Sequence, residues 1–447
     1  MCAGIAGVSL ALPATLAFDP WAWLVWGREV GHLQLDTTGG PSWKPLPVLA
    51  TTPLSVAGDH APTLWLLLAR TAGLLAVVVT YRLAARFAGS VAGAVAAGLL
   101  LLTPDGGPRF LRLVVEGHTA PLTATLGLWA VDRHLAGRHT QALLLATAFS
   151  LDRPEAWPFL GTYALWLWRC EPARRPLVAT ALSAVPVLWF GGDWWGSGDA
   201  WHGADAAQVV SSGVADRVAL AWERVAKVVV TPAWVAAAVA LVTAWRRRER
   251  ALLALGAGAA AWLALVGMMS VTLGYAALSR FLLPAAAALC VLAGVGVTRA
   301  VAAVPRGAAR FVCLAAIAVL SLPFVVTRVE SIGTVADGVT ARAELEHQLD
   351  VVLERAGGPE AVVACGRVVV RQSEVPRVAM AWKLDVPLDR VERDLRDRAG
   401  VVFVRAGRAE DARLAARPAH EVTELGRSDE WVAFAVGCDP HLDRRHG

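Results

Sequence analysis

Charged residues are scarce in this chain, and their scarcity excludes a soluble globular protein. They make up 18% of the 447 residues, whereas soluble domains contain about a quarter. Hydrophobic residues make up 56%, and the mean hydropathy is +0.50. We therefore expect a polytopic α-helical membrane protein that lies among membrane lipids.

Other features are missing or rare. The chain has no long low-complexity tract and no charge run typical of a nucleic-acid binder, so we expect no nucleic-acid partner. The arginine cluster at 246–248 indicates a cytoplasmic loop instead. Tyrosine occurs 3 times against 19 tryptophans. Many of these tryptophans stand where apolar runs end, which suits anchoring at a membrane interface.

The apolar runs predict about eleven membrane-spanning helices. We expect them near residues 1–17, 62–81, 89–104, 118–131, 140–151, 156–168, 176–190, 226–245, 251–274, 280–302 and 308–327. A spanning helix needs roughly 20 residues, so several of these runs are short. The first run is also compatible with a signal peptide, although it has no basic n-region.

Basic loops orient these helices. Arginine-rich connections are expected on the cytoplasmic side, and they lie at 81–86, 132–139, 169–175, 245–250 and 299–310. A cytoplasmic N-terminus places all of these loops inside. The same alternation places outside a second group, which comprises Asp19, Asp105, Glu116, Arg153, Glu155, Asp193, Arg280 and the C-terminus. We thus expect a multi-pass plasma-membrane protein with its acidic residues on the outer face.

From about residue 330 the composition changes to that of a soluble α/β domain. We expect an amphipathic helix at 340–356, strands at 362–365, 378–382, 401–404 and 431–436, and helices at 389–399 and 410–416. We divide the chain into a transmembrane part, 1–328, and an extracytoplasmic domain, 329–447. That domain has no glycine-rich phosphate loop and no metal-spaced Cys/His set, so we interpret it as accessory.

Two of the 6 cysteines, Cys365 and Cys438, belong to this outer domain. An oxidising exterior permits a disulfide between them. Two buried free thiols on neighbouring strands would give the same pattern, so both interpretations stay open.

Asp19 is the first ionisable side chain and follows the first apolar run. A carboxylate among Trp21, Trp23 and Trp26 at a membrane boundary is costly unless it has a function. Asp19 before Pro20 also fits a helix N-cap followed by proline at the first helical position. A cap would not exclude catalysis.

Several stretches, taken in order, resemble the membrane-integral, polyprenyl-phosphate-dependent glycosyltransferases of the C-type (GT-C) fold, in particular actinobacterial members. They lie at 18–29, 40–47, 153–158, 189–199 and 279–285. The resemblance covers about residues 1–328. It implies a GT-C fold and an inverting transfer of a sugar from a polyprenyl-phosphate donor to a glycan or lipid acceptor of the cell envelope. Nucleotide sugars are made in the cytosol, so an outward-facing transferase would use a lipid-linked donor.

The resemblance also implies site residues. Asp19 occupies the position of the family's general base, although Pro20 follows it where the family often has a second acidic residue. Part of the base role therefore passes to Glu116 or Glu155 as further catalytic candidates. Arg280 resembles the family's phosphate-contacting position; the alternative is an interfacial anchor that snorkels to the headgroups.

The other substrate-binding candidates are Lys44, Arg153, Asp193 and His118. Three of them have a structural alternative: Arg153 would pair with Glu155, His118 would lie with Glu116 in a capped, solvated turn, and Asp193 would belong to an interfacial turn. Oxygen ligands from separate loops suit a divalent cation. No local motif demands one, so we expect that no cofactor is required.

Two functions from other classes remain open. A transporter or flippase for a lipid-linked intermediate would need charges lining a path through the spans, whereas the ionisable groups gather at one mouth. A non-catalytic scaffold for envelope assembly would leave Asp19 dispensable.

Overall fold

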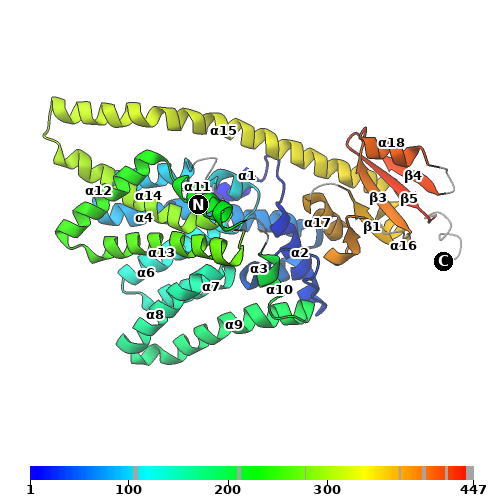
Figure 1. The fold of residues 1–447 in the computed structure, drawn as a ribbon, viewed down its shortest axis with the longest axis horizontal. Coiled ribbons are helices and arrows are strands. Elements are labelled where there is room, and N and C mark those ends of the chain that lie inside the picture. The colour runs from blue at the N-terminus through cyan, green and yellow to red at the C-terminus, as the bar shows by residue number, and fades with distance from the viewer. Residues whose placement is uncertain are drawn as a thin grey trace.

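The computed structural model describes residues 1–103, 109–208, 213–276, 278–371, 374–394, 399–417 and 421–438. For residue 412 it describes only the backbone. Asp105 and part of the helix expected at 389–399 lie outside the described residues. Helices form the first three quarters of the chain, and a small sheet domain follows (Figure 1).

The helical part is a bundle of long and short helices joined by 3-10 turns. Its elements are α1 (Cys2–Ser9), α2 (Phe18–Gly31), α3 (Pro45–Leu54), η1 (Ser55–His60), α4 (Ala61–Leu101), α5 (Phe110–Val115), α6 (Ala120–Leu135), α7 (His139–Asp152), η2 (Pro154–Ala156), α8 (Trp157–Cys170), η3 (Pro172–Arg174), α9 (Arg175–Ser197), α10 (His202–Ala206), α11 (Val214–Ala226), α12 (Thr231–Arg247), α13 (Arg250–Leu273), η4 (Ser279–Leu282), α14 (Leu283–Ala303) and α15 (Ala308–Arg355).

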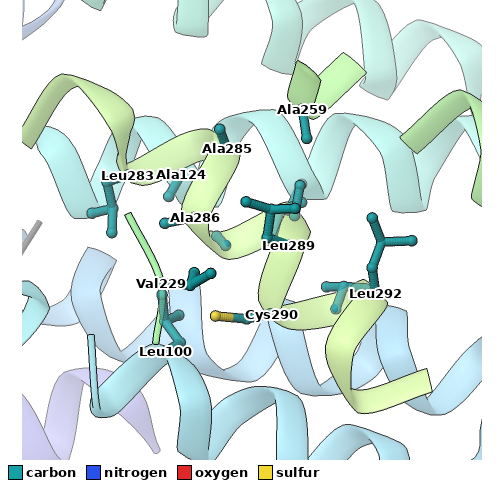
Figure 2. Packing of buried hydrophobic residues seen from close by; sticks show 14 of the residues in the cluster. Leu100, Ala124, Val229, Ala259, Leu283, Ala285, Ala286, Leu289, Cys290 and Leu292 are labelled. Atoms are coloured by element: carbon teal, nitrogen blue, oxygen red, sulfur yellow. The ribbon is translucent and has the colours of Figure 1, made fainter. Parts of the chain in front are cut away.

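Helix α14 lies at the centre of the bundle. Its first half is buried on all sides, and Figure 2 shows its side chains among those of α4, α6 and α13, with these residues labelled: Leu100, Ala124, Val229, Ala259, Leu283, Ala285, Ala286, Leu289, Cys290 and Leu292. Small residues permit this packing. A Cβ on Gly294 would overlap the carbonyl oxygen of Ala92, and one on Gly296 would overlap that of Ala236. Close approach at small residues is typical of helix packing in membranes.

Five of the described helical segments are long and apolar enough to cross a membrane, or six if the bent pair α11–α12 is one span. The expected total of eleven is therefore not confirmed, although helices occupy most of the described part of each expected run from 62 onward. Helix α4 joins two expected spans across a kink at Ala88 and Gly89. The first expected span is wrong as a continuous helix, because α1 has only 8 residues and residues 10–17 are not helical.

Helix α15 connects the bundle to the sheet domain. It has 48 residues and is thus about 70 Å long, more than twice the roughly 30 Å hydrocarbon core of a bilayer. Figure 1 shows it running along the bundle from the end next to α12 to the sheet domain. The expected domain boundary at 328/329 falls inside this one helix, and the division of the chain there stays a prediction.

The C-terminal domain contains a five-stranded mixed sheet of order β2-β1-β3-β5-β4. Its elements are α16 (Gly358–Ala364), β1 (Arg367–Val370), α17 (Glu374–Lys383), η5 (Leu388–Arg390), β2 (Val391–Glu392), β3 (Gly400–Arg405), α18 (Ala409–Ala415), β4 (Val422–Arg427) and β5 (Trp431–Val436). Strand β1 is parallel to β2 and β3, whereas β5 is antiparallel to β3 and β4.

The expected strands at 401–404 and 431–436 are confirmed as β3 and β5, and the helix at 410–416 as α18. The strands expected at 362–365 and 378–382 are wrong, since α16 and α17 occupy these runs. The helix expected at 389–399 is wrong at 391–392, which forms strand β2. Short apolar runs fit a strand or a buried helix equally well. Cys365 and Cys438 form a disulfide, which resolves the alternative left open by the sequence.

The sheet domain packs on the bundle through α17 and α2. Arg28 of α2 donates to the carbonyls of Trp382 at 3.2 Å and Val386 at 3.1 Å. Arg377 of α17 donates to the carbonyl of Gly39 at 2.8 Å. These bonds join the sheet domain to α2, which contains Asp19, and to the loop that follows it.

Candidate active site

A cavity of about 860 Å³ lies where the bundle meets the sheet domain. Its walls come from segments far apart in the chain: the start of α2, the loop before α3, the α7–α8 junction, α9, α10, the α13–α14 connection and α17. Five predicted site residues line it, namely Asp19, Lys44, Arg153, Asp193 and Arg280. The topology therefore brings together charges that the sequence scatters over 262 positions.

Asp19 and Arg280 form the central ion pair of this cavity. Asp19 is only 6% exposed, and its Oδ2 accepts a hydrogen bond from Arg280 Nη2 at 2.8 Å. Helix α2 begins one residue earlier, and Asp19 makes no cap bond to its backbone. The N-cap interpretation is therefore wrong. The guanidinium of Arg280 faces Asp19, which also argues against a purely snorkelling anchor.

The electrostatics keep Asp19 ionised. Burial raises the pKa of this carboxyl, but its neighbours Arg280, Lys44, His118 and Arg153, in decreasing order of effect, together lower it below its usual value. Within the described part of the chain no hydrogen bond reaches Asp19 Oδ1. Asp19 thus offers a carboxylate oxygen to the cavity at neutral pH.

Two further cations face the cavity without a carboxylate bonded to them in the described residues. Lys44 is buried, with its Nζ 5.2 Å from the centre of the Trp23 ring. Burial lowers the pKa of Lys44 to about 8, with Arg153 adding to this effect. The guanidinium of Arg153 stacks 4.0 Å from the centre of the Phe281 ring. Around the Asp19 carboxylate the cavity thus carries three cations, Arg280, Lys44 and Arg153, and this local excess of positive charge suits an anionic ligand.

His118 and Glu116 lie behind Arg280 and do not line the cavity. His118 Nδ1 is 3.5 Å from Arg280 Nη1, and His118 Nε2 is 3.6 Å from Glu116 Oε2. Glu116 also pairs with Arg112 at 2.6 Å and with Arg342 of α15. Both residues are buried, so the expected solvated turn is wrong.

Glu155 is buried beside the cavity and reaches it through a residue that the sequence did not single out. Its Oε1 accepts a hydrogen bond from the Tyr275 hydroxyl at 2.8 Å, and Tyr275 lines the cavity. Burial, with the nearby Glu155, raises the pKa of Tyr275 well above its usual value. Glu155 Oε2 has no partner among the described residues. No ion pair between Arg153 and Glu155 is formed within hydrogen-bond distance there, although their charges interact.

Asp193 of α9 also lines the cavity. Its Oδ2 accepts a hydrogen bond from the Gly203 backbone amide at 3.2 Å. A Cβ on Gly203 would lie 2.7 Å from that oxygen, so only glycine permits this approach. Around Asp193 the wall is aromatic, with Trp157, Trp189, Phe190 and Trp201.

The sheet domain contributes to the cavity, which the accessory interpretation did not anticipate. Glu374 and Arg377 of α17 line it together with Arg393. Glu374 pairs with Arg377 at 2.9 Å and also with Arg393. Residues from this domain are thus candidates for shaping the site.

In the described ranges no group of three or more His, Cys, Asp or Glu side chains is arranged to hold a metal ion. The expectation that no cofactor is needed stays a prediction.

Two solved structures share this fold. ArnT from Cupriavidus metallidurans bound to undecaprenyl phosphate matches with a TM-score of 0.57 and 16% identity, over 97% of this chain and 96% of that one. Its apo state matches with a TM-score of 0.54 over the same shares. The chain has the GT-C fold. An oligosaccharyltransferase from Archaeoglobus fulgidus matches with a TM-score of only 0.41 and 12% identity, over 88% of this chain and 61% of that one. No protein-family model and no curated protein sequence match.

Proposed function

We propose that this protein is an inverting glycosyltransferase that moves a sugar from a polyprenyl-phosphate donor to a cell-envelope acceptor on the outer face of the plasma membrane. The observation that carries the proposal is the convergence of the Asp19 carboxylate with Arg280, Lys44 and Arg153 on one cavity. A base and surplus cations are what the displacement of a phosphate by a hydroxyl requires. The GT-C fold, and the undecaprenyl phosphate bound to ArnT, support a lipid phosphate as the leaving group.

In the proposed reaction an acceptor hydroxyl attacks the anomeric carbon from the face opposite the phosphate. The new carbon–oxygen bond forms as the bond to the phosphate oxygen breaks, so the configuration inverts. Asp19 takes the hydroxyl proton on Oδ1, while Oδ2 keeps its bond to Arg280. The bonding electron pair leaves with the polyprenyl phosphate, and Lys44, Arg153 and Arg280 stabilise its charge.

We assign Glu116 and His118 as positioning residues instead of bases. Glu116 faces His118 Nε2, which leaves Nδ1 free to accept from Arg280. The backbone oxygen of Glu116 also accepts from the Ala17 amide at 3.0 Å, next to the start of α2. This turn therefore holds both members of the Asp19–Arg280 pair. We assign Glu155 likewise as a positioning residue, because it accepts the hydrogen bond from the Tyr275 hydroxyl.

The outer-face orientation is supported by the Cys365–Cys438 disulfide, because disulfides persist in oxidising compartments. It is tested with a membrane-impermeant maleimide on intact cells. Cys170 is exposed at the end of α8, in an expected inner loop. We expect wild-type protein to be labelled only after permeabilisation and the Asp199→Cys variant to be labelled in intact cells. The opposite pattern would reverse the orientation.

The activity is tested with the full chain in nanodiscs. Undecaprenyl phosphate should raise the unfolding temperature of the wild type, and the Lys44→Ala variant should lose most of this shift. Transfer is then assayed by mass spectrometry with polyprenyl-phosphate-linked mannose, glucose and arabinose and an extract of envelope glycans. No stabilisation by the lipid phosphate, or movement of the lipid across vesicles without any transfer, would contradict the proposal. Movement without transfer would indicate a flippase.

A further inference from the structure

Four aromatic side chains lie together in the lining of the cavity. Trp157 begins α8, Trp189 and Phe190 lie in the last turns of α9, and Trp201 follows α9. The rings touch in sequence: Trp157 is 5.9 Å from both Trp189 and Phe190, and Phe190 is 4.9 Å from Trp201, measured between ring centroids. We call these four residues the aromatic wall. None of the steps assigned above uses it.

A buried carboxylate oxygen without a partner lies beside the aromatic wall. Asp193 is 4% exposed, and its Oδ1 has no hydrogen-bond partner in the described part of the chain. Asp193 stands four residues after Trp189 and three after Phe190 on the same helix, so the three side chains share one face. Leaving a buried acceptor unpaired costs free energy. A ligand with a hydroxyl donor would remove this cost.

Interface anchoring accounts for other tryptophans but not for these. Trp194 and Trp195 lie on the same helix, are 67% and 45% exposed, and do not line the cavity. They suit contact with lipid headgroups. Trp201 is also 61% exposed, but it stacks on Phe190 and lines the same cavity as Asp19. The chain therefore carries two sets of tryptophans here, of which one faces the site.

We propose that the aromatic wall and Asp193 form the acceptor subsite, and that the acceptor is a saccharide. This rests on the proposed glycosyltransferase function. A sugar ring presents a face of C–H groups, which packs on Trp201 and Phe190, and hydroxyls around its edge, one of which donates to Asp193 Oδ1. The donor phosphate then occupies the cationic side of the cavity, and the acceptor hydroxyl that reacts points from the aromatic side toward Asp19.

The test measures saccharide binding without any donor. Wild-type protein in nanodiscs is mixed with mannotriose, arabinotriose or maltotriose and examined by saturation-transfer-difference NMR. We expect saturation transfer to at least one trisaccharide. The Trp201→Ala variant should lose it and Asp193→Asn should weaken it, whereas Trp201→Phe should retain most of it. Trp194→Ala is the matched control, since it removes an equally exposed tryptophan from the same region, and it should bind as the wild type does.

Kinetics separate this proposal from the proposed function. In Trp201→Ala the KM for the acceptor should rise about tenfold with the donor KM unchanged, which is the effect of losing a contact worth about 1.4 kcal/mol. Saccharide signals that are absent, or equal in Trp201→Ala and the wild type, would overturn the acceptor subsite. Stabilisation by undecaprenyl phosphate in that case would leave the transferase proposal standing. Transfer to a peptide or lipid acceptor unaffected by Trp201→Ala would likewise assign the wall to anchoring.

Discussion

Charged side chains gather at both ends of the helical bundle, but they are arranged differently. At the end next to the sheet domain, one carboxylate, Asp19, meets three cations around a cavity. At the other end, Asp132 is buried among Arg82, Arg86 and Arg133 and does not line that cavity. Charged groups that are fully paired with their neighbours hold loops together. Charged groups that face a cavity and still have an atom free to form a hydrogen bond can act on a ligand.

The second difference lies in the distance along the chain between partners. Glu249 and Arg299 pair at 2.6 Å across one helical hairpin at the basic end. Asp19 and Arg280 are 261 positions apart. Replacing matched residues at the two ends therefore separates effects on folding from effects on function.

The largest expected difference comes from the two buried aspartates. Asp19→Asn removes the proposed base, so we expect turnover per folded molecule to fall by about 10²–10⁴-fold. It also leaves Arg280 without its buried partner, so the unfolding temperature should fall as well. Asp132→Asn leaves its arginines unpaired, so we expect a lower unfolding temperature and normal turnover per folded molecule. Both are measured on protein in nanodiscs by transfer assay and thermal unfolding. An equal loss of turnover in both variants would contradict the assignment of Asp19 to the reaction and of Asp132 to stability.

The next difference comes from the two arginines. Arg280→Ala removes a charged hydrogen-bond donor from the phosphate side, so donor KM should rise about 10–100-fold, with Arg280→Lys intermediate. Arg299→Ala, which loses its bond to Glu249, should leave the donor KM unchanged. Initial rates over a range of donor concentrations provide the measurement. An unchanged donor KM in Arg280→Ala would return this residue to an anchoring role.

A smaller effect should appear on raising the pH. Lys44 has a pKa lowered to about 8 by burial. It is charged below that pH and loses its proton above it, so kcat/KM for the donor should fall several-fold between pH 7 and pH 9. Lys44→Arg keeps its charge throughout this range and should abolish the fall. If kcat/KM for the donor still fell between pH 7 and pH 9 in Lys44→Arg, the fall would belong to the titration of another group.

The smallest effect concerns the residues behind Arg280. Burial alone would raise the pKa of Glu116, but His118, Arg342 and Arg112 more than offset this effect and lower the pKa to about 2. Its ion pairs therefore stabilise the protein above the unfolded pKa near 4.5, and the contribution is lost as the pH falls toward 2. The difference in unfolding temperature between wild type and Glu116→Gln should shrink from pH 6 to pH 3.

Turnover of Glu116→Gln should fall only about fivefold, which is the order of one hydrogen bond. A loss as large as that of Asp19→Asn would make Glu116 a catalytic residue after all. A loss of turnover without any change in stability would also contradict its positioning role.

Sequence patterns predicted the bundle better than the sheet domain. The runs at 118–131, 251–274 and 280–302 match α6, α13 and α14 within a few residues, because hydrophobic length is a local property. In the sheet domain, α17 occupies a run expected as a strand. As a helix it places Trp382 against Trp21 of α2 and Arg377 against Gly39 in the loop that follows α2. These contacts favour one of two conformations that the short run fits equally well.

Candidate residues were predictable by type, but their partners were not. Asp19, Arg280, Lys44, Arg153 and Asp193 were singled out, and all of them line the cavity. Tyr275 was missed because a lone tyrosine after a span carries no motif. The sheet-domain residues at the cavity mouth were missed because nothing near them in sequence indicates a site.

The sequence by itself determined the membrane class, the apolar helices and the kinds of charged residue available to a site, because each depends on composition over a short window. Only the tertiary structure decided that Glu116 and His118 lie behind Arg280, that Glu155 accepts a hydrogen bond from Tyr275, and that residues of the sheet domain line the cavity. The free energy of a buried charge depends on which partners the fold places within a few ångströms, and these partners come from anywhere in the chain.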